Sequence, residues 1–373
     1  MGWPRVLEAP PLPSIRFRDR ALVPVWDKVQ AGGRLAEADG LACLRTWDLV
    51  GLGRMADWAA RQRSSDRVYF TLNVHINPTN ICVLACKFCD FAAKQGDPHA
   101  YEHTVEDILA QIHPDVHEVH IVGGHHPDWP FEHYEHLLRT IARERPRVQI
   151  KAFTAAEIDY FHKRWKLDEE EIFERLLAAG LHSMPGGGAE VFSERVRRAL
   201  FPGKAGADRW IEIHHIAHGM GIRSNATMLY GHIETYAERI RHLARLREAQ
   251  DETGGFLCFI PLEYQLGTTN LVPRPASPLE DLRTLATARL MLDNFPHVKA
   301  YWVMTGESTA AIGLNFGADD LDGTIGHERI AHAALAASPL GLTRDHMLRL
   351  IRSAGKVPVE RDAAYRPVQV HAA

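Results

Sequence analysis

Apolar and amphipathic segments alternate along the chain from residue 67 onward. Runs of apolar residues, several with period-two alternation, predict strands at residues 69–77, 117–123, 148–154, 181–185, 222–229, 255–261 and 299–305, with a short eighth near 318–321. Amphipathic stretches predict helices between them at residues 104–112, 131–144, 168–179, 191–200, 208–220, 234–250 and 278–293. Strands that alternate with helices form a parallel sheet, so this order predicts a (β/α)8 barrel, closed or slightly open.

Both ends of the chain carry helical periodicity instead. Residues 35–44 and 52–63 are predicted helices before the barrel, and residues 326–337 and 343–354 are predicted helices after it, followed by a polar tail. We therefore expect an N-terminal helical extension at residues 1–66, the barrel at residues 67–322 and a C-terminal helical extension at residues 323–373.

Two predicted strands have one polar and one apolar face. The polar positions are Thr71, Asn73, His75 and Asn77 in the first strand, and Arg223, Asn225 and Thr227 in the fifth. Strands of a fully packed parallel barrel are apolar on both faces. The pattern therefore predicts an interior lined for a polar ligand, unless one of these strands lies at an exposed edge.

Composition narrows the class of protein. The formal net charge is -4, and the 43 basic and 47 acidic residues are interspersed, which argues against a nucleic-acid-binding protein. The first residues lack the apolar core of a signal peptide, and no stretch approaches the roughly 18 apolar residues of a membrane span. We expect a cytoplasmic location.

Three of the five cysteines stand close together at Cys82, Cys86 and Cys89, directly after the first predicted strand. Three thiolates on one loop can hold an iron-sulfur cluster, and a [4Fe-4S] cluster normally takes four, so one iron would stay open for a ligand. A structural zinc or iron-sulfur site is the alternative, but it requires a fourth ligand. Cys43 and Cys258 are each expected to be small core residues.

The spacing of these cysteines, with Phe88 before the last, resembles the radical S-adenosylmethionine (SAM) superfamily. The resemblance implies that the open iron chelates SAM and that the reduced cluster cleaves it to a 5′-deoxyadenosyl radical. It places Gly123 and Gly124 against the methionine ammonium and Glu157 on the ribose hydroxyls. The turn at residues 184–190 would press on the adenosine, with Glu190 as a polar contact; a helix cap is the alternative there.

Further segments resemble the aminodeoxyfutalosine synthase family of menaquinone biosynthesis. They are residues 75–82, 122–128, 185–190, 225–235 and 357–362, whereas residues 263–269 depart from the family pattern. The resemblance implies that the adenosyl radical adds to the double bond of 3-[(1-carboxyvinyl)oxy]benzoate, with aryl migration and loss of a carboxylate, giving 6-amino-6-deoxyfutalosine. A flavodoxin or ferredoxin would supply the electron. Dehypoxanthine futalosine cyclase is the alternative within the superfamily.

A substrate with two carboxylates requires donors or positive charge inside the barrel, because an unpaired buried anion is costly. Arg223 is the first candidate for a carboxylate clamp, given the bidentate geometry of guanidinium. Weaker candidates for hydrogen-bond donors or proton handling are Asn73, His75, Asn225 and His232, and candidates for stacking on the aryl ring are Tyr230 and Tyr301.

Overall fold

The computed structural model describes residues 13–372. Its strands are β1 (Arg67–Thr71), β2 (Asn73–Ile76), β3 (Glu118–Ile121), β4 (Gln149–Ala152), β5 (Leu181–Met184), β6 (Arg223–Tyr230), β7 (Phe256–Glu263), β8 (His297–Val298), β9 (Asp320–Gly323), β10 (Val357–Arg361) and β11 (Pro367–Val370). Seven of them form a parallel sheet in the order β2-β3-β4-β5-β6-β7-β8, and a second sheet has the order β11-β10-β1-β9.

Strand β9 closes the ring between the two ends of the larger sheet. A bridge joins Lys299, just past β8, to Asp320 of β9, and the Ala300 N–H donates to the Asp320 carbonyl at 2.9 Å. On the other side, the His75 N–H of β2 donates to the carbonyl of Ile325 at 2.9 Å. The predicted eight-stranded barrel is therefore confirmed, with β9 in the eighth position.

Several of the helices that cover the barrel begin at capping residues. They and the remaining helices are η1 (Arg20–Leu22), α1 (Val23–Gln30), α2 (Glu37–Arg45), α3 (Leu49–Ser64), α4 (Val105–Gln111), α5 (Phe131–Glu144), α6 (Ala155–Trp165), α7 (Glu169–Ala178), α8 (Glu194–Leu200), α9 (Ala207–Gly219), α10 (Tyr236–Thr253), α11 (Pro278–Met291), α12 (Trp302–Thr305), α13 (Glu307–Gly313), α14 (Ile330–Ala333) and α15 (Arg344–Ser353). Helices α4, α6 and α10 each begin after a threonine whose side chain and that of an acidic residue three positions later form a capping box.

Two predicted strands differ from the structure, and one helix was not predicted. Residues 69–77 form two strands, because the chain leaves one sheet after Thr71 and enters the other at Asn73, while the period-two pattern runs on unbroken. Of residues 299–305, the last four are the short helix α12. Helix α6, with its Thr154 and Glu157 capping box, was not predicted.

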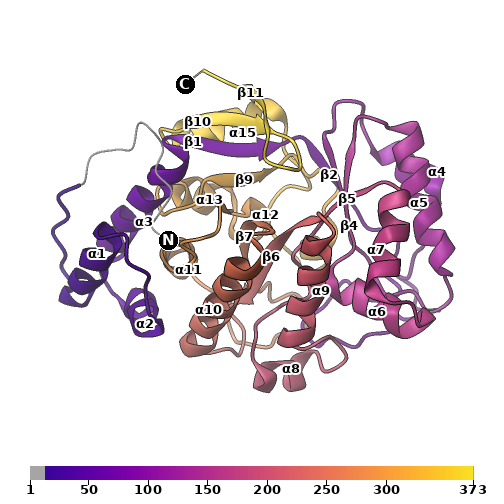
Figure 1. The fold of residues 1–373 in the computed structure, drawn as a ribbon, viewed down its shortest axis with the longest axis horizontal. Helices are drawn as coiled ribbons and strands as arrows, with labels where there is room; N and C mark the ends of the chain where they lie inside the picture. The colour runs from indigo at the N-terminus through magenta and orange to yellow at the C-terminus, as the bar shows by residue number, and fades with distance from the viewer. Residues whose placement is uncertain (1–12, 373) are drawn as a thin grey trace.

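The C-terminal extension is also not wholly helical. Only the four residues of α14 are helical within 326–337, and the tail forms β10 and β11. Strand β10 pairs in parallel with β1, from Arg67 beside Val357 to Phe70 beside Glu360, and Figure 1 shows β10 and β11 alongside β1. The domain boundaries after residues 66 and 322 stay a prediction, although this pairing ties the last segment to the first strand.

The N-terminal helices pack on the outside of the barrel. Helix α3 lies against α11, and α2 lies against α10 and α11, on the side of the molecule drawn in indigo in Figure 1. Arg247 of α10 donates to the carbonyl of Leu35 at 2.8 Å. No helix among residues 13–372 is long and apolar enough to cross a bilayer.

Candidate active site

A cavity of about 300 Å³ opens where the barrel strands end, and all three clustered cysteines line it. Its other walls come from the turns after β3, β4, β5, β7 and β8. The C-terminal ends of the strands are where barrels of this kind place their chemistry. The cavity is therefore the candidate active site.

The loop at residues 82–89, called the Cys loop below, is fixed at both ends. The Cys82 N–H donates to the carbonyl of Ala93 at 2.9 Å, and the Cys89 N–H donates to the carbonyl of Cys86 at 3.2 Å. All three thiols are free and partly exposed. Burial raises the pKa of Cys86 to about 11 and also raises the pKa of Cys89.

The residues present fit an iron-sulfur cluster. Soft thiolate ligands select such clusters, and these three thiols share one cavity with free space beside them. Among residues 13–372, no three His, Cys, Asp or Glu side chains lie close enough together to hold a single metal ion. The thiols therefore suit a group that offers several metal atoms better than they suit one zinc ion.

The Gly pair after β3 approaches the segment that leads into the Cys loop at very short range. A Cβ at Gly124 would lie 2.1 Å from the carbonyl oxygen of Ile81, and one at Gly123 would lie 3.1 Å from that of Thr79. Both glycines line the cavity and leave the backbone open to a ligand. His125 follows, buried in the cavity wall, and its Nδ1 has no partner among the described residues.

Glu157 lies behind the Gly pair as part of the cap of α6. Its carboxylate accepts hydrogen bonds from the Gly123 N–H at 3.3 Å, the Thr154 N–H at 2.7 Å and the Thr154 hydroxyl at 2.8 Å. Burial raises the pKa of Glu157 to about 7, although these hydrogen bonds oppose the rise. The carboxyl group therefore changes charge near neutral pH.

Replacing Glu157 with Gln is expected to remove a pH dependence of stability. The Glu157 pKa of about 7 exceeds the ordinary value of 4.5, so between these pH values the folded chain binds more protons and the free energy of unfolding falls as pH rises. This fall amounts to about 3 kcal/mol. Urea unfolding of SAM-free protein from about pH 4.5 to about pH 8 checks it; wild-type and variant curves that run parallel would contradict the assignment.

Glu190 forms a second polar group beside the Cys loop. Its carboxylate pairs with the Lys204 ammonium at 2.6 Å, and that ammonium lies 5.2 Å from the centre of the Phe88 ring. All three side chains line the cavity. Burial lowers the pKa of Lys204, but Glu190 and Cys86 outweigh burial and leave the pKa above its ordinary value. Lys204 was not predicted, because it lies outside the motifs on a loop after α8.

The opposite wall of the cavity comes from β7, β8 and the segment after β9. Glu263 and Tyr301 line it together with Glu328. Burial, and then Asp281, raise the pKa of Glu263 to about 8, so this carboxyl is mostly neutral at pH 7. Residues 264–270 connect this wall to Asp90, the residue after the Cys loop, since the Thr268 N–H and hydroxyl both donate to its carboxylate.

Comparison with known proteins agrees with this geometry. The radical SAM superfamily model matches residues 76–246, and a model of the CofH/MqnC C-terminal region matches residues 253–373. An aminodeoxyfutalosine synthase of Thermus thermophilus is 45% identical over 95% of this chain and 98% of its own length. The chain belongs to the aminodeoxyfutalosine synthase family. The predicted cofactors, a [4Fe-4S] cluster and SAM, are those of the superfamily.

Other relatives of the synthase family are less similar or share only the fold. An aminodeoxyfutalosine synthase of Streptomyces coelicolor is 40% identical over 91% of this chain and 92% of its length. A cyclic dehypoxanthine futalosine synthase of the same organism is 39% identical over 94% and 90%. The crystal structure of methylornithine synthase superposes with a TM-score of 0.73, covering 90% of this chain and 97% of that one, at 18% identity. That likeness confirms the fold class.

The structure brings together most of the residues predicted for the synthase site. The cavity is lined by Cys82, Cys86, Phe88, Cys89, Gly123, Gly124, Glu157, Glu190, Asn225, His75 and Tyr301. The polar face of β6 also contributes Thr227, whose hydroxyl donates to the carbonyl of Gly186 at 2.7 Å. Of the polar-face residues predicted for the interior, His75, Asn225 and Thr227 line the cavity, whereas Thr71, Asn73, Asn77 and Arg223 do not. The individual roles stay predictions.

Arg223 does not line the cavity, and the predicted carboxylate clamp is corrected. The residue is exposed at the start of β6, where its Nη1 donates to the carbonyl of Gly254 at 2.8 Å. Arg223 shares a strand face with Asn225, but the cavity lies toward the other end of that strand. Asn73 also has a structural role, because both polar atoms of its side-chain amide are hydrogen-bonded within the fold. Its Nδ2 donates to the Asp322 carboxylate at 2.9 Å, and its Oδ1 accepts from the Ile325 N–H at 2.8 Å.

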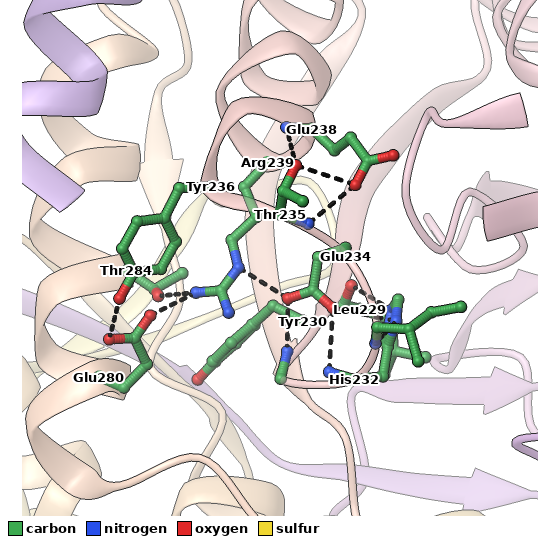
Figure 2. Close-up of polar contacts among 12 residues, drawn as sticks. Leu229, Tyr230, His232, Glu234, Thr235, Tyr236, Glu238, Arg239, Glu280 and Thr284 are labelled. Carbon is green, nitrogen blue, oxygen red and sulfur yellow. Dashed lines mark hydrogen bonds and ion pairs between the residues drawn. The ribbon is translucent and has the colours of Figure 1, made fainter. Parts of the chain in front are cut away.

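His232 and Tyr230 are likewise held outside the cavity. The His232 Nδ1 lies 2.9 Å from Glu234, with both side chains fully buried, and Glu234 accepts from the Arg239 Nε at 2.7 Å. Figure 2 shows Glu234 between these two partners, in the turn after β6. The Tyr230 hydroxyl donates to Asp281 at 2.8 Å. The side chains of His232 and Tyr230 therefore position the turn and do not line the cavity.

Proposed function

We propose that this chain joins the adenosyl group of SAM to 3-[(1-carboxyvinyl)oxy]benzoate and forms 6-amino-6-deoxyfutalosine, with aryl migration and loss of one carboxylate. SAM is then a co-substrate, and methionine is released. The observation that carries the proposal is one cavity lined by three free cysteines, by the Gly pair and by buried carboxyl groups. The 45% identity to an aminodeoxyfutalosine synthase over nearly the whole chain supports the substrate.

On the cofactor side, Cys82, Cys86 and Cys89 would hold a [4Fe-4S] cluster, which supplies the single electron that cleaves SAM. Lys204 lies beside the Cys loop and can bind the methionine carboxylate through its ammonium. Glu157, partly charged near neutral pH, can accept hydrogen bonds from the ribose hydroxyls.

The backbone of the Gly pair, which lines the cavity, would face the methionine ammonium. Glu190 and Phe88 lie around Lys204 and line the same cavity. Asn225, on the cavity face of β6, is placed to donate to adenosine.

On the substrate side, apolar side chains form a wall for the aryl ring. Ile260, Leu262 and Met304 line this part of the cavity with Tyr301, which is 7% exposed. An apolar wall excludes water, and in doing so it protects a reactive radical from side reactions. His75 of β2 is a polar group that lines the same cavity.

A flavodoxin or ferredoxin would serve as the one-electron donor, in the cytoplasm. The Cys loop supports this, since its three cysteines are partly exposed and Val83 between them is 46% exposed. A carrier could therefore approach the cluster from outside.

The test is anaerobic reconstitution with iron and sulfide, reduction with dithionite, and incubation with SAM and the enolpyruvyl benzoate. Mass spectrometry is expected to show the coupled product and free methionine in equal amounts. Dehypoxanthine futalosine cyclase chemistry, in which the radical takes hydrogen from a ribose, would instead leave free 5′-deoxyadenosine. Free 5′-deoxyadenosine without coupled product would refute the proposal.

A further inference from the structure

His75, His120 and Lys151 form a row across three neighbouring strands. Parallel pairing sets His75 of β2 beside His120 of β3, and His120 beside Lys151 of β4. All three side chains line the cavity, one residue before their strands end. Partners in register point to the same face of a sheet, so the row is a fixed part of the cavity floor.

Lys151 is the cation that this row presents. Its ammonium pairs with the buried Glu118, and Arg361 of β10 lies 3.6 Å from the other oxygen of that carboxylate. Burial raises the pKa of Glu118, but Lys151 and Arg361 outweigh it and leave the pKa below its ordinary value. A lysine ammonium has three N–H donors, so two remain after the bond to Glu118.

The buried charges beneath the cavity balance one another. The cations are Lys151, Lys299 and Arg361, and the carboxylates are Glu118, Asp320 and Asp322, joined in neighbouring pairs. Asp322 also lines the cavity, but Lys299 lies 3.0 Å from it and the Asn73 amide donates to it. An anion that enters must therefore be met by unused donors, and these lie at Lys151.

His120 supplies a second unused polar atom. Its Nδ1 lies 3.3 Å from the Nε2 of His75, while its own Nε2 is shielded from solvent and has no partner among residues 13–372. Burial lowers the pKa of both imidazoles, so each is neutral at pH 7. When His75 donates in the shared hydrogen bond, the second proton of the pair sits on the His120 Nε2, a donor without a partner among residues 13–372, on a residue that lines the cavity.

We propose that Lys151 and His120 bind the ring carboxylate of the substrate, a role that rests on the proposed function. Unpartnered polar atoms in a closed site call for a ligand that satisfies them. The ring carboxylate persists in the product, whereas the enolpyruvyl carboxylate is lost. A strong ground-state ion pair to the departing group would oppose its loss, because only interactions that strengthen in the transition state accelerate a reaction.

The test compares two ligands that differ by this one group. Calorimetric titration of SAM-loaded protein measures the Kd of the enolpyruvyl benzoate and of 2-phenoxyacrylate, which lacks the ring carboxylate. The variant is Lys151→Met with Glu118→Gln, so that no buried carboxylate is left unpaired. We expect the variant to bind the benzoate about 10- to 100-fold more weakly and to bind 2-phenoxyacrylate as wild type does.

The control is Glu118→Gln alone, with Lys151 present, which should keep the benzoate preference. Equal weakening of both ligands, or of SAM, would mean a structural role and would overturn the proposal, as would unchanged benzoate binding. The wild-type reaction separates this inference from the proposed function. If wild-type protein forms the coupled product, the proposed function stands. If the variant then still prefers the benzoate over 2-phenoxyacrylate, only the inference about Lys151 and His120 is refuted.

Discussion

Replacing Cys86 with Ala is expected to abolish SAM cleavage, to the level of a protein-free mixture. Cys86 lies between the other two cysteines on one loop, and all three line the cavity. A cluster that normally takes four thiolates and here has three cannot be held by two. Iron and sulfide analysis, electron paramagnetic resonance of the reduced protein and the yield of 5′-deoxyadenosyl products measure the loss.

Cys43 provides the matched control. It is fully buried in α2, away from the cavity, and burial raises the pKa of its thiol to about 12, so it has no thiolate to offer. Cys43→Ala should keep the iron content and the activity of wild type and lose only about 1 kcal/mol of stability. Wild-type activity in Cys86→Ala, or zinc in place of iron in reconstituted wild type, would contradict the cluster assignment.

Replacing Glu234 with Gln is expected to lower the free energy of unfolding by about 3 to 5 kcal/mol, because it breaks a buried ion pair and leaves the Arg239 guanidinium with Glu280 as its carboxylate partner. The carboxylate accepts from the Gly231 N–H at 2.7 Å and the His232 N–H at 2.9 Å, besides pairing with the side chains of His232 and Arg239. An amide cannot accept at all of these contacts. Urea unfolding of both proteins at pH 7 measures the difference.

The pH dependence gives a second check on Glu234. Burial raises its pKa, but His232 and Arg239 outweigh burial and bring it to about 2, below the ordinary 4.5. Its contribution is therefore present above pH 4.5 and is lost as pH falls toward 2. Glu248→Gln, an exposed position on α10, the helix that follows this turn, should change stability by less than about 0.5 kcal/mol. If Glu234→Gln also changed stability by less than about 0.5 kcal/mol, the ion pairs would not be what stabilises the turn.

These ion pairs explain why the sequence misplaced two substrate residues. Tyr230 and His232 stand directly after the cavity-facing positions of β6, in a segment that resembles the family. Their side chains instead meet acidic groups on the turn and on α11, namely Glu234 and Asp281. Asp281 comes close to Tyr230 only once α11 has packed, so no local pattern reveals that contact.

Arg223 was misplaced for a different reason. Period-two alternation assigned it to the same face as Asn225 and Thr227, and the structure keeps that order along β6. Periodicity predicts which face of a strand a residue lies on, but it does not predict how far along the strand the cavity lies. Arg223 lies at the exposed beginning of the strand, where it bonds to the carbonyl of Gly254.

The sequence by itself determined the features that depend on short spacings. The sequence showed the three cysteines within eight residues and the alternation of strands and helices, and it showed part of the polar lining. The structure brings the cysteines to one cavity together with His75, Asn225 and Thr227. Only the tertiary structure decided which groups meet across distant segments. Lys204 reaches Glu190, β10 joins β1, and strand register aligns His75, His120 and Lys151. Register and packing set these contacts between residues far apart in the chain, and local periodicity carries no record of them.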